Sequence, residues 1–220
     1  MAWLTESRID WIAKTFLIRR EWIDGEDGRI HEQFAFDKAP QHFFSTISQH
    51  SDALVWEDVH DHCVVHILRW GIDKEWMNDG EGRVFVVMAI PLVRLSNERT
   101  IYKYISDFQP YPWANYARTK IQLRAWVRLL FISKGFLCFG REISHQAGES
   151  IWSNKVFLRD IIENQSKRTR DDWHPEDHAL HPEESLVAKD TDTLPTVIEY
   201  LKTNNLPWEM TRLGTVRHRS

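Results

Sequence analysis

Hydrophobic residues recur along this chain with two different periods, and these separate the expected strands from the expected helices. Residues 62–70 and 83–93 are rich in β-branched and apolar side chains and flank a turn-forming Asn-Asp-Gly sequence, so they predict an antiparallel hairpin. Residues 84–90 show no polar alternation, which predicts a strand covered on both faces. A further short strand is expected at 136–139. Apolar residues at helical spacing predict helices over about 5–22, 40–50, 97–108, 113–134, 150–166 and 195–203.

These elements predict an α+β fold in which a small antiparallel sheet packs with several helices. Residues 1–165 form the expected main domain. The segment 166–193 is polar and contains few large apolar residues, so we expect an exposed linker or loop there. Residues 194–220 are expected to form a C-terminal helix followed by a loose tail.

The expected elements between about residues 96 and 140 follow an order that occurs in DNA-binding proteins. A helix over about 97–108 is followed by the turn QPYP at 109–112, by the long helix over 113–134 and by a short strand after Gly135. This order resembles a winged helix-turn-helix domain from its second helix onward. The resemblance implies that the helix over 113–134 is a recognition helix, which in that family enters the major groove of DNA.

Positive charge is concentrated in the middle of the chain, although the formal net charge of the whole protein is −4. Residues 93–141 contain 9 Lys and Arg but only 2 Asp and Glu, a net charge of +7 between flanks of −7 and −4. Such an asymmetry bears on the partners of a protein rather than on its fold, because a positively charged segment attracts polyanions.

The long helix over 113–134 carries much of this positive charge in a regular pattern. Lys120, Arg124 and Arg128 follow one another at intervals of four residues, about 6 Å apart along the helix axis. Neighbouring aromatic side chains could stack unpaired bases. The same pattern also fits a solvated helix face, or cations that pair with the acidic flanks of the chain. The expected nucleic-acid-binding residues are Lys120, Arg124, Arg128, Arg118, Lys134, Trp113 and Tyr116.

Two histidine clusters provide an alternative, catalytic hypothesis. His60 and His62 are two residues apart, so they would share one face of a strand, and His174 and His178 would share one face of a helical turn. Neutral imidazoles at these spacings can converge on a divalent metal ion. In addition, the spacing of Arg168 and His174 resembles that of HEPN-type ribonucleases, in which Arg and His on one helix serve RNA cleavage.

Several function classes lack their motifs in this chain. The sequence contains no GxSxG, no phosphate-binding GxxxxGK loop and no GxGxxG, so we expect no organic cofactor, with a divalent metal ion as the open alternative. The two cysteines lie in apolar runs and form no CxxC pair, and the N-terminal residues do not have the pattern of a signal peptide. We therefore expect a cytoplasmic protein that is not embedded in a membrane.

The leading hypothesis from the sequence is a non-catalytic nucleic-acid-binding or polyanion-binding protein that is a subunit of a larger assembly. A content of 11 Trp residues favours contact with a protein partner or a second copy of the chain. The two alternatives are a metal-dependent hydrolase or nuclease that uses the clustered histidines, and a protein–protein interaction module.

Overall fold

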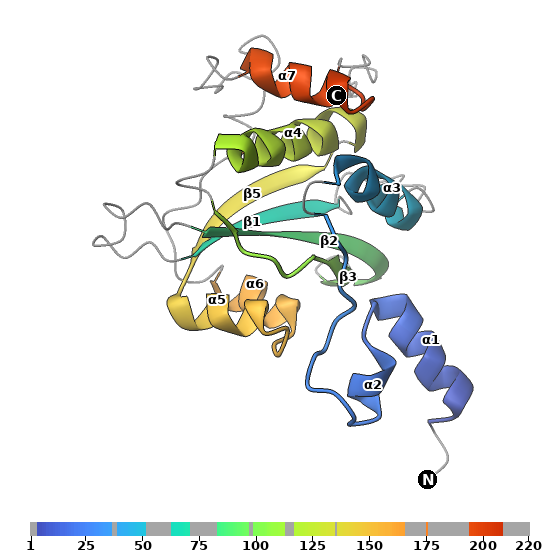
Figure 1. Ribbon diagram of the computed structural model, residues 1–220. Helices are drawn as coiled ribbons and strands as arrows, with labels where there is room; N and C mark the ends of the chain where they lie inside the picture. Colours follow the sequence, from blue (N-terminus) through green and yellow to red (C-terminus); the bar gives the residue numbers. More distant parts are fainter. Residues whose placement is uncertain are drawn as a thin grey trace.

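The computed structural model describes residues 4–36, 39–51, 63–70, 83–96, 99–112, 117–134, 136–165, 175 and 194–208. These residues form seven helices and a mixed sheet of five strands (Figure 1), which confirms the predicted α+β fold. The elements in chain order are α1 (Glu6–Phe16), α2 (Arg20–Ile23), α3 (Pro40–Ser51), β1 (Val64–Trp70), β2 (Arg83–Ser96), β3 (Arg99–Ile105), β4 (Tyr111–Pro112), α4 (Ala117–Lys134), β5 (Leu137–Ile143), α5 (His145–Trp152), α6 (Leu158–Gln165) and α7 (Leu194–Thr203).

The sheet has the strand order β3-β2-β1-β5, with β4 extending the β3 side of β2. β1 and β2 pair antiparallel, which confirms the predicted hairpin pairing, while the predicted turn between them lies outside the described residues. β5 runs parallel to β1, so the sheet is mixed rather than purely antiparallel. The reason is the connection through α4, because a helical crossover returns the chain in the direction of the earlier strand.

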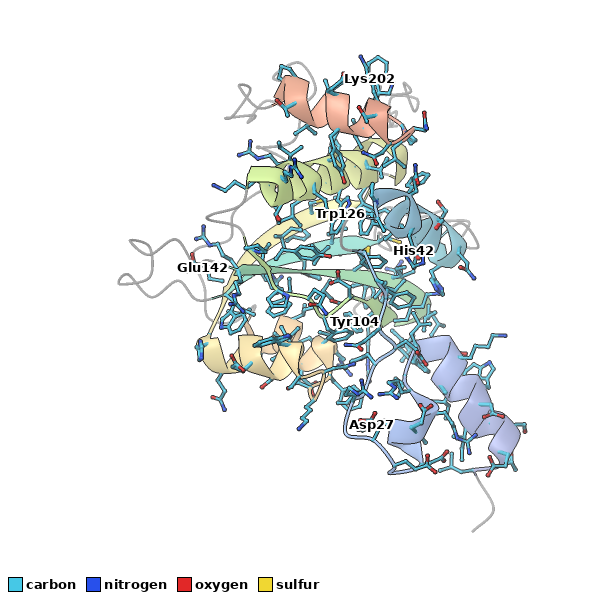
Figure 2. All side chains as sticks on the ribbon, in the orientation of Figure 1. Asp27, His42, Tyr104, Trp126, Glu142 and Lys202 are labelled. Atoms are coloured by element: carbon cyan, nitrogen blue, oxygen red, sulfur yellow. The ribbon has the colours of Figure 1, made fainter. Side chains whose placement is uncertain are left out.

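Helices cover both faces of the sheet, as the uninterrupted apolar run of β2 predicts. Alternate residues of β2 point to opposite faces, and all residues from Val84 to Pro91 are buried. On one face Val84 and Val86 join the core formed with α3 and α4, where the rings of Phe43 and Trp126 stack with centroids 4.4 Å apart (Figure 2 labels Trp126). On the other face Phe85 packs in the core formed with α5 and α6.

The helix predicted over about 97–108 is wrong, because residues 99–105 form strand β3. β3 pairs antiparallel with β2 from Met88 to Ser96. Its β-branched and aromatic residues, among them Ile101 and Tyr104, favour a pleated strand, and pairing with β2 satisfies its backbone. The helix-turn-helix order on which the winged-helix resemblance rested is therefore absent from this segment.

Two other predicted helices are each divided by a residue in the left-handed region. Leu17, with φ of 55°, ends α1 and separates it from α2. Asn154, with φ of 54°, follows α5, so the helix predicted over 150–166 is instead the pair α5 and α6. The helix predictions near 40–50 and 195–203 are confirmed by α3 and α7.

The C-terminal helix α7 packs on the outer side of α4, as Figure 1 shows. The contact is apolar and joins Ala125 and Leu129 of α4 to Val197 and Leu201 of α7. The predicted linker over 166–193 lies outside the described residues, apart from Pro175. Among the helices that the structure describes, none combines the length and the apolar character needed to cross a membrane.

Candidate functional site

The predicted basic helix is α4, which lies between the sheet on one side and α7 on the other. Leu123 and Leu130 face the sheet, whereas Ala125 and Leu129 face α7. The described side chains of α4 that retain access to solvent are Arg118, Lys120, Ile121, Arg124 and Phe131. The three cations in this set, Arg118, Lys120 and Arg124, are called the basic surface of α4 below.

Arg128, the third member of the predicted stripe, does not reach that surface. Its relative exposure is 2%, and its Nη2 donates a hydrogen bond to the backbone carbonyl of Trp208 at 3.2 Å. The segment that follows α7 covers it. The exposed part of the stripe therefore ends at Arg124, and Arg128 joins the C-terminal segment to α4.

The start of α4 places positive charge where the helix itself is already positive. Arg118 and Lys120 lie in its first turn, which contains no acidic residue. Unsatisfied N–H groups give a helix N-terminus a partial positive charge, so each cation there destabilises the helix by about 0.3–1 kcal/mol. Among the described residues, no carboxylate forms an ion pair with either side chain.

The other residues predicted for function lie beyond what the structure describes. Trp113 and Tyr116 precede the described part of α4, and the side chain of Lys134 at its end is not described either. The histidines predicted to bind metal, His60, His62, His174 and His178, also lie outside the described residues. Within the described part of the chain, no group of three or more His, Cys, Asp or Glu side chains could hold a metal ion.

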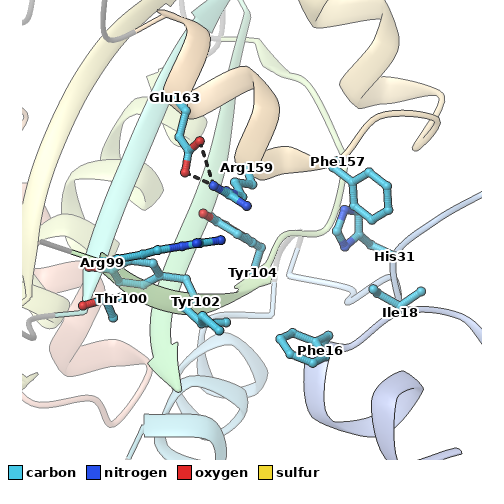
Figure 3. Close-up of a pocket in the computed structure, with 11 residues that line it drawn as sticks. Phe16, Ile18, His31, Arg99, Thr100, Tyr102, Tyr104, Phe157, Arg159 and Glu163 are labelled. Atoms are coloured by element: carbon cyan, nitrogen blue, oxygen red, sulfur yellow. Dashed lines mark hydrogen bonds and ion pairs between the residues drawn. The ribbon is translucent and has the colours of Figure 1, made fainter. Parts of the chain in front are cut away.

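A pocket of about 230 Å³ lies at the other face of the sheet, between β3, the region around α6 and the N-terminal segment of residues 16–31 (Figure 3). We call it the β3 pocket. Its polar groups, from Arg99, Tyr104, Arg159 and Glu163, gather on one side, whereas Phe16, Ile18 and Phe157 form the opposite side, next to His31. The pocket thus has a charged wall and an aromatic wall.

The charged wall contains one guanidinium that is already paired. Arg159 donates two hydrogen bonds to Glu163, from Nε to Oε1 at 2.6 Å and from Nη2 to Oε2 at 3.1 Å. Arg99 is exposed and has no ion pair with any described carboxylate. Burial raises the pKa of Tyr104, and the Glu163 carboxylate raises it further, so this phenol keeps its proton at neutral pH.

The aromatic wall contains a buried histidine. His31 is 3% exposed, stacks on Phe108 at 5.7 Å and meets Phe157 edge-on at 5.9 Å. Burial lowers the pKa of His31 to about 4, so its ring is neutral at pH 7. Its Nε2 lies 3.5 Å from the backbone N–H of Leu158, whereas Nδ1 has no hydrogen-bonding partner among the described residues.

Asn154 holds this histidine in place. Its side-chain Nδ2 donates to the carbonyl of His31 at 2.7 Å, and its Oδ1 accepts from the N–H of His31 at 3.0 Å. The neighbouring N–H of Ile30 donates to the backbone carbonyl of Asn154 at 2.8 Å. The turn between α5 and α6 therefore fixes the N-terminal segment that closes the pocket.

Sequence reasoning did not find the β3 pocket, because its walls come from three distant parts of the chain. One local signal was present: Tyr102 and Tyr104 are two residues apart, which places both on one face of a strand. A helix over 97–108, as predicted, would place Tyr102 and Tyr104 on different sides, whereas strand β3 places them on one face.

A second, larger hollow of about 520 Å³ lies between residues 33–36 and 107–112. Its most distinctive group is the buried carboxylate of Asp107, which accepts hydrogen bonds from the hydroxyl of Tyr111 and, at 3.2 Å, from the N–H of Gln109. None of its described lining residues is basic, so it has no counter-charge for an anion.

Comparisons of this chain with protein-family models, with curated proteins and with solved structures found no match.

Proposed function

We propose that this protein is a non-catalytic nucleic-acid-binding or other polyanion-binding protein that acts as a subunit of a larger assembly. The observation that carries the proposal is the first turn of α4, where Arg118 and Lys120 stand without an acidic neighbour in the helix. Arg124 continues the positive charge along the same helix.

Folding alone does not account for these cations. α4 is held by apolar contacts on two sides, to the sheet and to α7, and those contacts need neither Arg118 nor Lys120. At the start of a helix, two cations add to the positive end of the dipole instead of offsetting it. Arg118 and Lys120 are two residues apart and therefore point to different sides of the helix. Each could attract a separate phosphate, and the helix terminus between them favours anions as well.

The spacing of the surface suits an extended backbone of phosphates. Lys120 and Arg124 are four residues apart, which places them about 6 Å apart along the axis. Successive phosphates of a single strand are separated by a similar distance, so one strand could contact both cations. Cys63 and Cys138 are buried in the core as thiols, which fits the cytoplasmic location expected from the sequence.

The test is binding of fluorescently labelled single-stranded and duplex oligonucleotides, measured by anisotropy over a series of salt concentrations. The variant is Arg118→Ala with Lys120→Ala, and the control removes the same charge elsewhere, with Lys14→Ala and Lys155→Ala. If each cation contacts one phosphate, the slope of log K against log salt falls by about 1.4–1.8 in the variant and stays constant in the control.

Two results would contradict this proposal. One is the absence of binding to any oligonucleotide at low salt. The other is equal affinity and equal salt dependence of the α4 variant and the wild type, because the bound phosphates would then lie elsewhere.

A further inference from the structure

We infer that the β3 pocket is a binding site for a small aromatic anion, meaning a molecule with one flat ring and one anionic group. This site is separate from the basic surface of α4. α4 covers one face of the sheet, whereas α6, which supplies part of the pocket, covers the other (Figure 1).

The size of the pocket sets the size of the ligand. A cavity of about 150 Å³ is large enough for benzene, and drug-sized ligands occupy about 300–1,000 Å³. At about 230 Å³, the β3 pocket holds one ring with a short substituent. It is too small to enclose a complete dinucleotide cofactor.

The charged wall determines the sign of the ligand. Glu163 already neutralises Arg159 through two hydrogen bonds, so Arg99 contributes the net positive charge of the pocket. The Arg99 side chain extends toward the hydroxyl end of Tyr104 (Figure 3). A guanidinium and a neutral phenol are both donors, and together they suit a carboxylate or phosphate oxygen.

The aromatic wall determines the shape of the ligand. Phe16 and Phe157 offer ring surfaces for stacking, and aromatic pairs prefer offset or edge-on contacts between flat groups. His31 adds a neutral ring to this wall, and this ring meets Phe157 edge-on.

Other ligand classes match the pocket less well. A cationic ligand would be repelled by Arg99. A purely apolar ligand would displace water from the guanidinium and the Tyr104 hydroxyl without replacing their hydrogen bonds, which is unfavourable. Inorganic phosphate would satisfy the charged wall but leave the aromatic wall without a contact.

The test is a titration of the full chain, followed by NMR, with probes that separate these contributions. Two probes carry the proposed chemistry with different anionic groups: 4-hydroxybenzoate and phenyl phosphate. Phenol is the neutral counterpart of both, and inorganic phosphate is the anion without a ring. The variants are Arg99→Ala and Tyr104→Phe, and the control is Arg118→Ala on the opposite face.

We expect at least one of the two aromatic anions to bind, and which one binds identifies the anionic group that the pocket recognises. Its neutral counterpart and inorganic phosphate should bind at least tenfold more weakly. Loss of a hydrogen bond to a charged group lowers affinity by about tenfold to a hundredfold, so Arg99→Ala should show that loss. Tyr104→Phe should cause a smaller loss, and Arg118→Ala should cause none.

The inference would be overturned if neither aromatic anion bound at millimolar concentration, if phenol bound as tightly as the anions, or if Arg99→Ala left affinity unchanged. Because Arg99 is exposed, its replacement by alanine should leave the fold intact, and circular dichroism verifies this independently. Oligonucleotide binding through α4 is measured with different variants, so either proposal can fail without the other.

Discussion

Replacing Asn154 with alanine should strongly destabilise the protein, because this residue joins two parts of the chain that are 123 positions apart in sequence. Its side chain is fully buried and makes two hydrogen bonds with the backbone of His31. Alanine removes both bonds and leaves a buried N–H and a buried C=O without these partners, at about 1–3 kcal/mol for each group. Alanine is also less favourable than asparagine at the positive φ of 54°. We expect a total loss of about 3–5 kcal/mol.

A second variant separates the two causes. Asn154→Gly loses the same hydrogen bonds but adopts a positive φ without strain, so it should be about 1 kcal/mol more stable than Asn154→Ala. Urea denaturation followed by tryptophan fluorescence measures both free energies of unfolding. Hydrogen exchange at the amide of His31 gives a local measurement and should become faster in both variants.

Two results would refute this account of Asn154. If the alanine variant lost less than about 1 kcal/mol, the two hydrogen bonds would not hold the N-terminal segment. If the glycine variant were no more stable than the alanine variant, the backbone conformation would contribute nothing. Since His31 lines the β3 pocket, both Asn154 variants should bind a ligand in this pocket more weakly than the wild type.

Two further predictions concern buried positions elsewhere in the fold. Gly148→Ala should destabilise the protein by several kcal/mol, since the added Cβ would lie 2.4 Å from the Trp70 ring. Gly28→Ala is the control and should be tolerated, because the atom nearest to its added Cβ is 3.8 Å away. Thermal unfolding compares the two variants. Burial lowers the pKa of His31 to about 4 and that of His66 to about 3, so below about pH 6.5 the unfolded chain binds more protons than the folded protein. Each histidine should therefore lower the free energy of unfolding by about 1.4 kcal/mol per pH unit, from about pH 6.5 down to its folded pKa. Urea midpoints that stay constant between pH 7 and pH 5 would contradict this.

Local patterns in the sequence predicted those elements whose neighbours do not alter their structure. The hairpin of β1 and β2 followed from two apolar runs around a turn sequence, and α3 followed from a helix start at Pro40. β3 was missed because its alternation includes the half-buried Lys103, and because its strand structure depends on pairing with β2. Local propensity is a weak guide where a neighbouring strand supplies the hydrogen bonds.

The β3 pocket could not be predicted because no single segment contains it. Phe16 and His31 come from the N-terminal segment, Arg99 and Tyr104 from β3, and Phe157 from the turn before α6. These parts meet only after Asn154 has tied the N-terminal segment to the α5–α6 turn. Short-range periodicity gives the faces of single elements, and this site depends on contacts between elements.

The positions of the residues around the helix explain why Arg128 is buried while Lys120 and Arg124 stay partly exposed. With 100° per residue, Lys120 lies at 0°, Arg124 at about 40° and Arg128 at about 80° around α4. The small or apolar residues that face α7 begin beside Arg128, since Ala125 lies at about 140° and Leu129 at about 180°. Among the three cations of the stripe, Arg128 is the nearest in angle to this second apolar side, so the segment after α7 covers it and the Trp208 carbonyl accepts its hydrogen bond. Lys120 is farthest from α7 and lies in the first turn, so the counter-charge for the basic surface should be sought at the N-terminal end of α4.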